Sequence, residues 1–276
     1  MGRTISFSGV VIAVLDSGLR ATHEDAGQWK QATGYDYVRG IETPPGTAID
    51  TGCWGGHGTH VGTIAAGDTN NGLGVAGAGF NSGILPMRVL NGSTCEIWAP
   101  STRDWPLRWA RLNGAHIINM SYYFEGPDPD EEAVMAESWA NGVTPVGSAA
   151  NFERNIDAAP LYPCAYLYVV CVGANKNDGT RCPATGFGNS GSSWVDFTAP
   201  SEVAWGAGSA SDTSYIYDPC HTSYSVPLVS GAMALLRSLG KGPQAQYDAM
   251  VTGSAARRNT WTTWGEIDAG ASLAVP

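Results

Sequence analysis

The sequence predicts an α/β protein of one domain, with a mainly parallel sheet that carries helices on both faces. Short apolar or β-branched runs alternate with helical patterns along the chain, which is typical of strands joined by crossover helices. The runs are apolar almost throughout, as expected of strands that are buried on both faces. No internal repeat, charge block or linker interrupts the 276 residues, so we expect residues 1–276 to form a single domain.

Six runs are predicted as strands because they are short, apolar and rich in β-branched and aromatic residues. They span residues 10–15, 84–90, 116–121, 143–150, 166–174 and 195–200.

Four segments carry a helical pattern. They span residues 59–67, 104–112, 130–142 and 223–240. The third has acidic residues in its first turn and Gly142 at its end, and the fourth ends at Gly240. Pro227, in the fourth, is compatible with a first helical turn, where a missing N–H costs nothing.

The composition excludes several classes of protein. With 43% hydrophobic and 14% charged residues, the chain is not disordered, because disorder combines low hydrophobicity with high charge. A formal net charge of −10 repels phosphate backbones, so we expect no nucleic-acid partner. No apolar run approaches the roughly 20 residues of a membrane helix, so we expect no membrane partner either.

The six cysteines contain no Cys-x-x-Cys pair, which favours disulfides over a zinc site. Their spacing leaves the connectivity open. Disulfides form in oxidising compartments, so we expect a secreted, extracellular domain. The chain opens without a signal peptide, so we expect a mature domain whose signal peptide and propeptide lie outside this chain.

Two polar residues stand where predicted strands end. Asp16 follows the first strand and Asn151 follows the fourth. Ligands of parallel α/β sheets bind at the carboxyl ends of the strands, which makes both residues candidates for a site. When each residue is considered alone, a structural role is favoured: a turn or helix-capping role for Asp16 and a turn role for Asn151.

A histidine pair lies in the segment GGHGTH, at the start of a predicted helix. His57 and His60 are three residues apart, as in some metal sites, but the H-E-x-x-H arrangement of metalloproteases is absent. Glycines on both sides of His57 leave its ring open to a cleft, whereas His60 is expected to be a packed structural residue.

Ser223 lies at the start of the last predicted helix, in the segment CHTSYSVPLVSG. The N–H groups of a first helical turn are unpaired and the helix dipole favours negative charge there, which suits a nucleophile. A helix N-cap at Thr222 or Ser223 is the alternative. The G-x-S-x-G turn of α/β-hydrolases is absent.

Asp, His and Ser occur in the chain order of the subtilisin triad. The segments VVIAVLDSGL, GGHGTHVGTIAA, INMS, SAAN and TSYSVPLVSGAMALL resemble those of the subtilisin-like serine protease (subtilase) family. The resemblance runs from about residue 7 to residue 273. It implies a three-layer subtilisin-like fold and a serine endopeptidase that works through an acyl-enzyme, without a catalytic cofactor.

The resemblance also assigns catalytic roles. Ser223 matches the nucleophile, His57 the general base and Asp16 the carboxylate that orients it. Asn151 matches the side chain that donates to the oxyanion, beside the N–H of Ser223. A serine hydroxyl is weak until an imidazole takes its proton, and the oxyanion then needs preorganised donors.

The resemblance also implies the position of the substrate cleft, in which the substrate backbone pairs with the enzyme as an added β-strand. The walls would be formed by Ser121, Tyr122 and Tyr123, by Ser148, Ala149, Ala150 and Asn151, and by Glu96, Ile97 and Trp98. Three positions depart from the family: His221 replaces a glycine, Tyr224 a methionine, and Ala150 a glycine. The tyrosines of the cleft add further bulk. We therefore expect a narrowed cleft that prefers small or slender apolar residues before the cut.

The resemblance further implies a structural calcium ion. Its oxygen ligands would come from the side chains of Asp25 and Asn71 and from the carbonyl groups of Thr69, Leu73 and Val75. Another family ligand comes from a longer N-terminal segment, and only 15 residues precede Asp16.

Some secreted subtilases have a disulfide in the region of Cys53 and Cys95, so this pair is predicted to be bonded. We expect a monomer that acts on protein or peptide substrates and is a potential target of a propeptide-like inhibitor. Two alternatives stay open. The chain is a binding or regulatory module with an occluded cleft, or a subtilase specialised for peptide ligation or ester chemistry.

Overall fold

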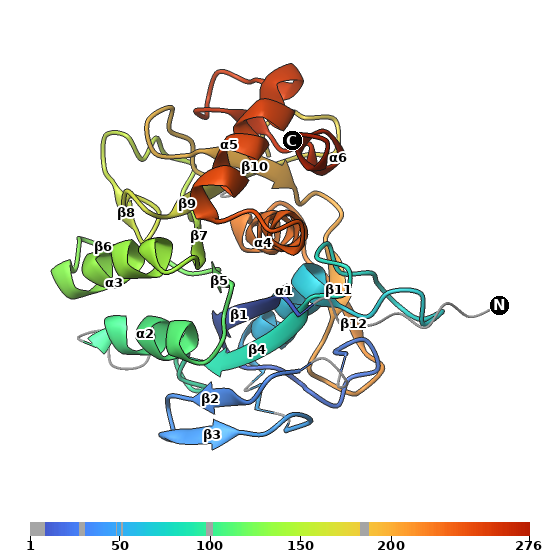
Figure 1. Cartoon of the computed structure of the whole chain (residues 1–276). Helices are drawn as coiled ribbons and strands as arrows, with labels where there is room; N and C mark the ends of the chain where they lie inside the picture. Colours follow the sequence, from blue (N-terminus) through green and yellow to red (C-terminus); the bar gives the residue numbers. More distant parts are fainter. Residues whose placement is uncertain (1–8, 28–30, 48, 51, 98–101, 183–187) are drawn as a thin grey trace.

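A long sheet runs through the middle of the molecule, with helices packed against both of its faces (Figure 1). The computed structural model describes all residues except 1–8, 28–30, 48, 51, 98–101 and 183–187. Within this part of the chain, nine strands form the main sheet. In spatial order they are β13 (Gly265–Glu266), β10 (Phe197–Pro200), β9 (Val170–Asn175), β7 (Thr144–Ser148), β5 (Ile117–Met120), β1 (Val11–Asp16), β4 (Gly83–Arg88), β2 (Gly34–Asp36) and β3 (Ile41–Thr43).

All neighbours in this sheet are parallel except β2 and β3, which form an antiparallel edge. The predicted α/β class and the six predicted strands are therefore confirmed. The strand predicted over residues 166–174 begins only at Val170, because Tyr166 and Val169 are held in turns by hydrogen bonds to preceding carbonyl groups.

The side chains of β1 alternate between two cores, which explains why its sequence is apolar throughout. Ile12 and Val14 belong to one buried cluster, together with residues of α1 (His57–Ala66) and α4 (Thr222–Ser238). Ala13 and Leu15 belong to the other, with residues of α2 (Asp104–Leu112) and α3 (Pro129–Ala140). The result is three layers, helix on sheet on helix (Figure 1).

The four predicted helices are confirmed as α1 to α4. The helix α3 begins after Asp128, whose carboxylate accepts hydrogen bonds from the N–H groups of Asp130 and Glu131. The remaining elements are η2 (Cys53–Gly55), β6 (Phe124–Glu125), β8 (Leu161–Tyr162), β11 (Trp205–Ala207), β12 (Tyr215–Tyr217), α5 (Pro243–Gly253), η4 (Ser254–Arg257) and α6 (Ala269–Leu273). None of the helices in the described residues has the length and apolar character needed to cross a bilayer.

Three disulfides join the six cysteines in pairs. Cys53 is bonded to Cys95, which confirms the predicted pair. The other two pairs, which the spacing left open, are Cys164–Cys171 and Cys182–Cys220. The first bridge ties the segment before α1 to the loop after β4.

Candidate active site

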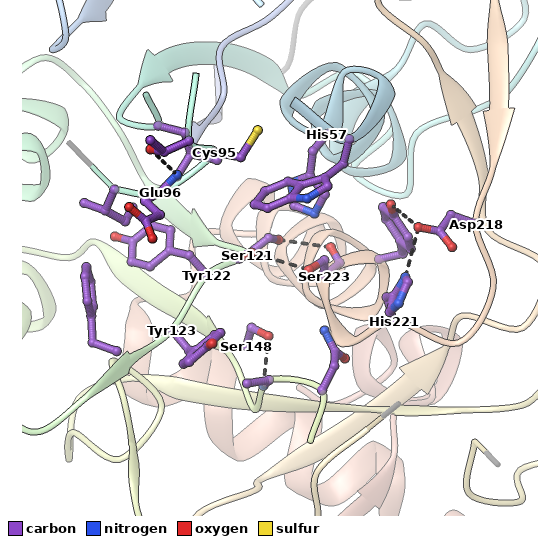
Figure 2. Close-up of a pocket in the computed structure, with 18 of the residues that line it drawn as sticks. His57, Cys95, Glu96, Ser121, Tyr122, Tyr123, Ser148, Asp218, His221 and Ser223 are labelled. Carbon is purple, nitrogen blue, oxygen red and sulfur yellow. Dashed lines mark hydrogen bonds and ion pairs between the residues drawn. The ribbon is translucent and has the colours of Figure 1, made fainter. Parts of the chain in front are cut away.

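The polar residues of the site meet at the carboxyl end of β1. The strands that follow β1 in the chain are added on both sides of it, β4 on one side and β5 on the other. The carboxyl ends of the strands around such a switch point form a crevice. A cavity of about 870 Å³ opens there (Figure 2). Of the predicted site residues, those that line it are His57, Glu96, Ile97, Ser121, Tyr122, Tyr123, Ser148, Ala150, Asn151 and Ser223.

Asp16 and His57 form a buried pair at the end of β1. The Nδ1 atom of His57 lies 2.8 and 2.9 Å from the two carboxylate oxygens of Asp16. The pair requires α1 to approach the strand end closely. A Cβ at Gly58 would lie 2.2 Å from the carbonyl oxygen of Gly18, so glycine after His57 permits the contact as well as clearing space for the ring.

Two opposing effects act on the pKa of His57. Burial lowers it, because the interior disfavours the charged imidazolium. The charge of Asp16 and its hydrogen bond act in the opposite direction and outweigh burial, so the pKa is raised above its usual 6.5. The Nδ1 atom carries the proton that faces Asp16, which leaves Nε2 as the basic nitrogen of the neutral ring.

Ser223 is the second residue of α4 and lines the same cavity as His57. Its hydroxyl lies 3.4 Å from the carbonyl oxygen of Ser121, and the hydroxyl of Ser121 donates to the carbonyl of Ser223 at 3.0 Å. Among the described residues, no hydrogen bond joins Ser223 to His57; such bonds are often long in the absence of substrate.

Pro227 explains why the carbonyl of Ser223 accepts a hydrogen bond from the hydroxyl of Ser121. Contrary to the expectation of a first-turn position, Pro227 lies inside α4, four residues after Ser223. A residue there would normally donate its N–H to the carbonyl of Ser223, but proline has no N–H. The hydroxyl of Ser121 satisfies this carbonyl instead, and so ties the segment after β5 to the nucleophile candidate.

The amide of Asn151 has a fixed orientation. Its Oδ1 atom accepts two hydrogen bonds at 2.9 Å, from the N–H and the hydroxyl of Thr222. A backbone N–H requires an acceptor, which assigns the oxygen end to Thr222 and leaves the NH₂ end for another partner. The N–H of Ser223 lies in the first turn of α4, where helical N–H groups have no partner within the helix.

Ala150, which stands where the family has a glycine, adopts a left-handed backbone conformation with φ of 63°. An L-residue pays a steric cost there that glycine does not. Ala150 lines the cavity, whereas Ala149 is buried behind it.

An aromatic contact bridges the two walls expected for the residue before the cut. The ring of Tyr123 meets the ring of Phe152 edge-on, with centroids 4.8 Å apart. The guanidinium of Arg154 lies over Phe152 at 5.0 Å and also 3.7 Å from the carboxylate of Glu125. Phe152 could not be predicted from the sequence, because only the fold brings its segment opposite Tyr123.

The far wall of the cavity contains Glu96 and Ile97, as expected, while Trp98 lies outside the described residues. Trp54 was not predicted. Its ring packs edge-on to His57 with centroids 5.4 Å apart, and it is held beside the histidine because Cys53 is bonded to Cys95.

Tyr224 lines the cavity, but most of its side chain is turned into the core and only 1% of it is exposed. Its ring packs against His60 with centroids 4.2 Å apart. His60 is buried and contacts the carbonyl of Ala204 at 3.0 Å; burial lowers its pKa to about 4, which keeps it neutral. His60 is therefore a structural residue.

The residues expected to bind calcium come together, but their hydrogen bonds do not fit an all-oxygen cation site. The carboxylate of Asp25 accepts from the side-chain NH₂ of Asn71 at 2.6 Å, from the N–H of Val75 at 2.7 Å and from the hydroxyl of Tyr215 at 2.9 Å. Donors that point at a carboxylate cannot ligate a cation. Within the described residues, no group of three or more His, Cys, Asp or Glu side chains is arranged for a metal.

Comparisons with known proteins agree with this architecture. The model of the subtilase family matches residues 8–264. The chain is 28% identical over 257 residues to thermitase of Thermoactinomyces vulgaris, covering 93% of this chain and 85% of thermitase. It is 32% identical to a thermophilic serine proteinase of Bacillus sp. (strain AK1) over 85% of this chain, but spans only 53% of that relative.

A solved protease structure from Pseudoalteromonas arctica superimposes with a TM-score of 0.80 at 26% identity, covering 97% of this chain and 91% of that one. The chain belongs to the subtilase family, and it is accordingly a hydrolase of the serine endopeptidase class.

Proposed function

We propose that residues 1–276 form a catalytic domain that cleaves peptide bonds with Ser223 as nucleophile, His57 as general base and Asp16 as its orienting partner. The observation that carries this proposal is the buried pair of Asp16 and His57, with contacts of 2.8 and 2.9 Å, beside a cavity that both His57 and Ser223 line. The raised pKa of His57 supports it, because the imidazolium formed during the reaction is stabilised by Asp16.

The reaction has two halves. In the first, His57 takes the proton of Ser223 as Oγ bonds to the scissile carbonyl carbon; His57 then gives that proton to the amine as the C–N bond breaks. In the second, water loses a proton to His57, attacks the acyl carbon, and Ser223 regains its proton as the ester bond breaks. All proton transfers use residues of the chain, so the mechanism requires no cofactor.

The oxyanion of each tetrahedral intermediate needs donors aimed at it in advance. We assign this role to the NH₂ group of Asn151 and the N–H of Ser223. Support comes from Thr222, whose two donors occupy the oxygen of the amide and leave its nitrogen end for the cavity.

The substrate is a protein or peptide chain that lies along Ser121–Tyr123, with a small side chain before the scissile bond. The contact between Tyr123 and Phe152 supports this preference, because it links Tyr123 of one wall to the residue that follows the other wall. Three disulfides support function in an oxidising environment outside the cell. A cavity of about 870 Å³ around Ser223 favours catalysis over the alternative of an occluded binding module.

A fluorophosphonate probe tests the assignment, because it labels only an activated serine. We expect a single labelled residue, Ser223, located by mass spectrometry, and no label in Ser223→Ala. Ser223 is not the N-cap of α4, and its hydroxyl makes one long hydrogen bond of 3.4 Å, so its loss should cost about 1 kcal/mol and this variant should remain folded. Peptide hydrolysis by folded Ser223→Ala, or labelling at another serine, would overturn the proposal.

A further inference from the structure

A second histidine–aspartate pair lines the cavity on the side of Ser223 opposite Tyr122 (Figure 2). The Nδ1 atom of His221 lies 3.0 Å from Oδ2 of Asp218. The mechanism proposed above uses neither residue. In the sequence, His221 is notable only as a bulky residue in place of a glycine. No local pattern points to a role for Asp218.

The carboxylate of Asp218 is held in place but remains accessible. Its Oδ2 atom accepts from His221 and also from the hydroxyl of Tyr224, again at 3.0 Å. Tyr224 is anchored in the core beside His60, so the carboxylate is attached to a rigid support. The side chain of Asp218 is nevertheless 42% exposed, and within the described residues no hydrogen bond falls on Oδ1.

The charges around the cavity favour a cation. Besides His57 and His221, its charged lining consists of Glu96, Glu125 and Asp218, and within the described part of the chain neither lysine nor arginine lines it. Partial burial raises the pKa of Asp218, but the hydrogen bond and charge of His221 outweigh this effect and lower it, so the carboxylate is ionised.

The direction of the substrate assigns this pair to one side of the cut. In the proposed function, residues before the scissile bond lie along Ser121–Tyr123. The chain beyond the bond must then continue past Ser223 on the opposite side, where Asp218 and His221 lie (Figure 2).

We propose that Asp218, held by His221 and Tyr224, forms a binding subsite for a cationic side chain, lysine or arginine, on the leaving-group side of the scissile bond. This proposal rests on the proposed function. It makes Asp218 a specificity-determining residue, and His221 and Tyr224 its positioning residues.

Partitioning of the acyl-enzyme isolates this subsite. One ester substrate generates the same acyl-enzyme in every assay, and the amide of lysine, glutamine or glutamic acid is added as nucleophile. The amine nitrogen bonds to the acyl carbon while the ester bond to Ser223 breaks, and the proton of the amine passes through His57 to the serine oxygen. The ratio of new amide to free acid, measured by chromatography, reports only binding on the leaving-group side.

We expect wild type to favour lysinamide over the glutamic acid amide by about tenfold at low salt, with glutaminamide between them, because an exposed ion pair contributes severalfold and repulsion acts against the acid. Added salt should reduce the ratio. In Asp218→Asn, the preference for lysinamide over the glutamic acid amide should fall below about twofold. Asp248→Asn makes the same change of charge on α5, away from the cavity, and should leave the ratio as in wild type.

The subsite would be overturned if wild type used the three amides equally, or if Asp218→Asn and Asp248→Asn lowered the ratio equally. In either case an acyl-enzyme that forms normally leaves the proposed function standing. If no acyl-enzyme forms on Ser223, both proposals fail.

Discussion

At the scale of single residues, the carboxylate of Asp16 raises the pKa of His57 above 6.5 despite the burial of the ring. In the proposed mechanism the neutral imidazole of His57 is the active base. We therefore expect kcat/KM to rise with pH, with a midpoint above 6.5. Asp16→Asn removes the charge that raises the pKa, so its residual activity should have a lower midpoint. A pH profile that is flat, or identical in the two proteins, would contradict a histidine base.

We expect Tyr123 and Phe152, also considered as single residues, to limit the size of the side chain before the cut. Tyr123→Gly and Phe152→Ala each remove one side of the bridge, whose rings lie 4.8 Å apart. Both changes should raise kcat/KM for phenylalanine relative to alanine at this position by at least about tenfold, because pocket volume discriminates by that order. Profiling of the three proteins on one peptide library measures it. The idea fails if wild type already prefers phenylalanine or tyrosine and the variants do not differ.

At the scale of elements, the sequence was sufficient to predict the long, apolar strands and helices. It was also sufficient to predict the elements that carry a recognisable local motif. The strands around Asp16 and the helices that begin near His57 and Ser223 were predictable, because periodicity and caps are local properties. Phe152 and Asp218 were not predictable, because each is brought to its neighbours in the site only when the chain folds. The short strands β2 and β3 have too few residues for a pattern.

The loop that contains Asn71 and Val75 is another element whose role differs from expectation. Direct hydrogen bonds to Asp25 hold it, so we expect the melting temperature to be the same in calcium and in a chelator. Asp25→Ala should lower stability by about 1–3 kcal/mol in both conditions, because it removes three hydrogen bonds and leaves the half-buried donors of Val75 and Tyr215 without this acceptor. Tyr215→Phe, which removes one donor, should cost about 1 kcal/mol. A calcium-dependent rise in melting temperature that Asp25→Ala abolishes would restore the calcium site.

The helix α3 carries a buried carboxylate that links stability to pH. Glu131 is fully buried, 3.0 Å from the hydroxyl of Tyr166 and 3.6 Å from Arg103, and burial raises its pKa from 4.5 to about 7. The folded state therefore holds this proton more strongly than the unfolded state. The resulting stability is fully present below about pH 4.5 and is lost as the pH rises to about 7.

Glu131→Gln cannot titrate, so the difference in unfolding free energy between it and wild type should change by up to about 3 kcal/mol between pH 4.5 and 8, in favour of the variant at the higher pH. Denaturant unfolding across this range measures the change. The exposed neighbour Glu132 provides the control, because Glu132→Gln should follow the wild-type pH dependence. Parallel curves for wild type and Glu131→Gln would contradict the assignment.

At the scale of the whole molecule, the disulfides differ in how much chain they constrain. Cys53 and Cys95 are 42 residues apart, whereas Cys164 and Cys171 are 7 apart. Replacing the first pair with alanine should cost about 4 kcal/mol and the second about 2.5 kcal/mol, because loop entropy grows with loop length. Denaturant unfolding of the two double variants tests the order, and a larger loss for the second pair would contradict it.

The proline inside α4 has a consequence for how a substrate is aligned. Because Pro227 leaves the carbonyl of Ser223 to the hydroxyl of Ser121, the segment proposed to dock the peptide and the serine proposed to attack it are joined by a direct hydrogen bond. A strand that slips by one residue turns its other face to the enzyme. In the proposed function, the hydrogen bond between the two serines therefore sets the register of a docked chain relative to Ser223. This register determines which peptide bond is presented for cleavage.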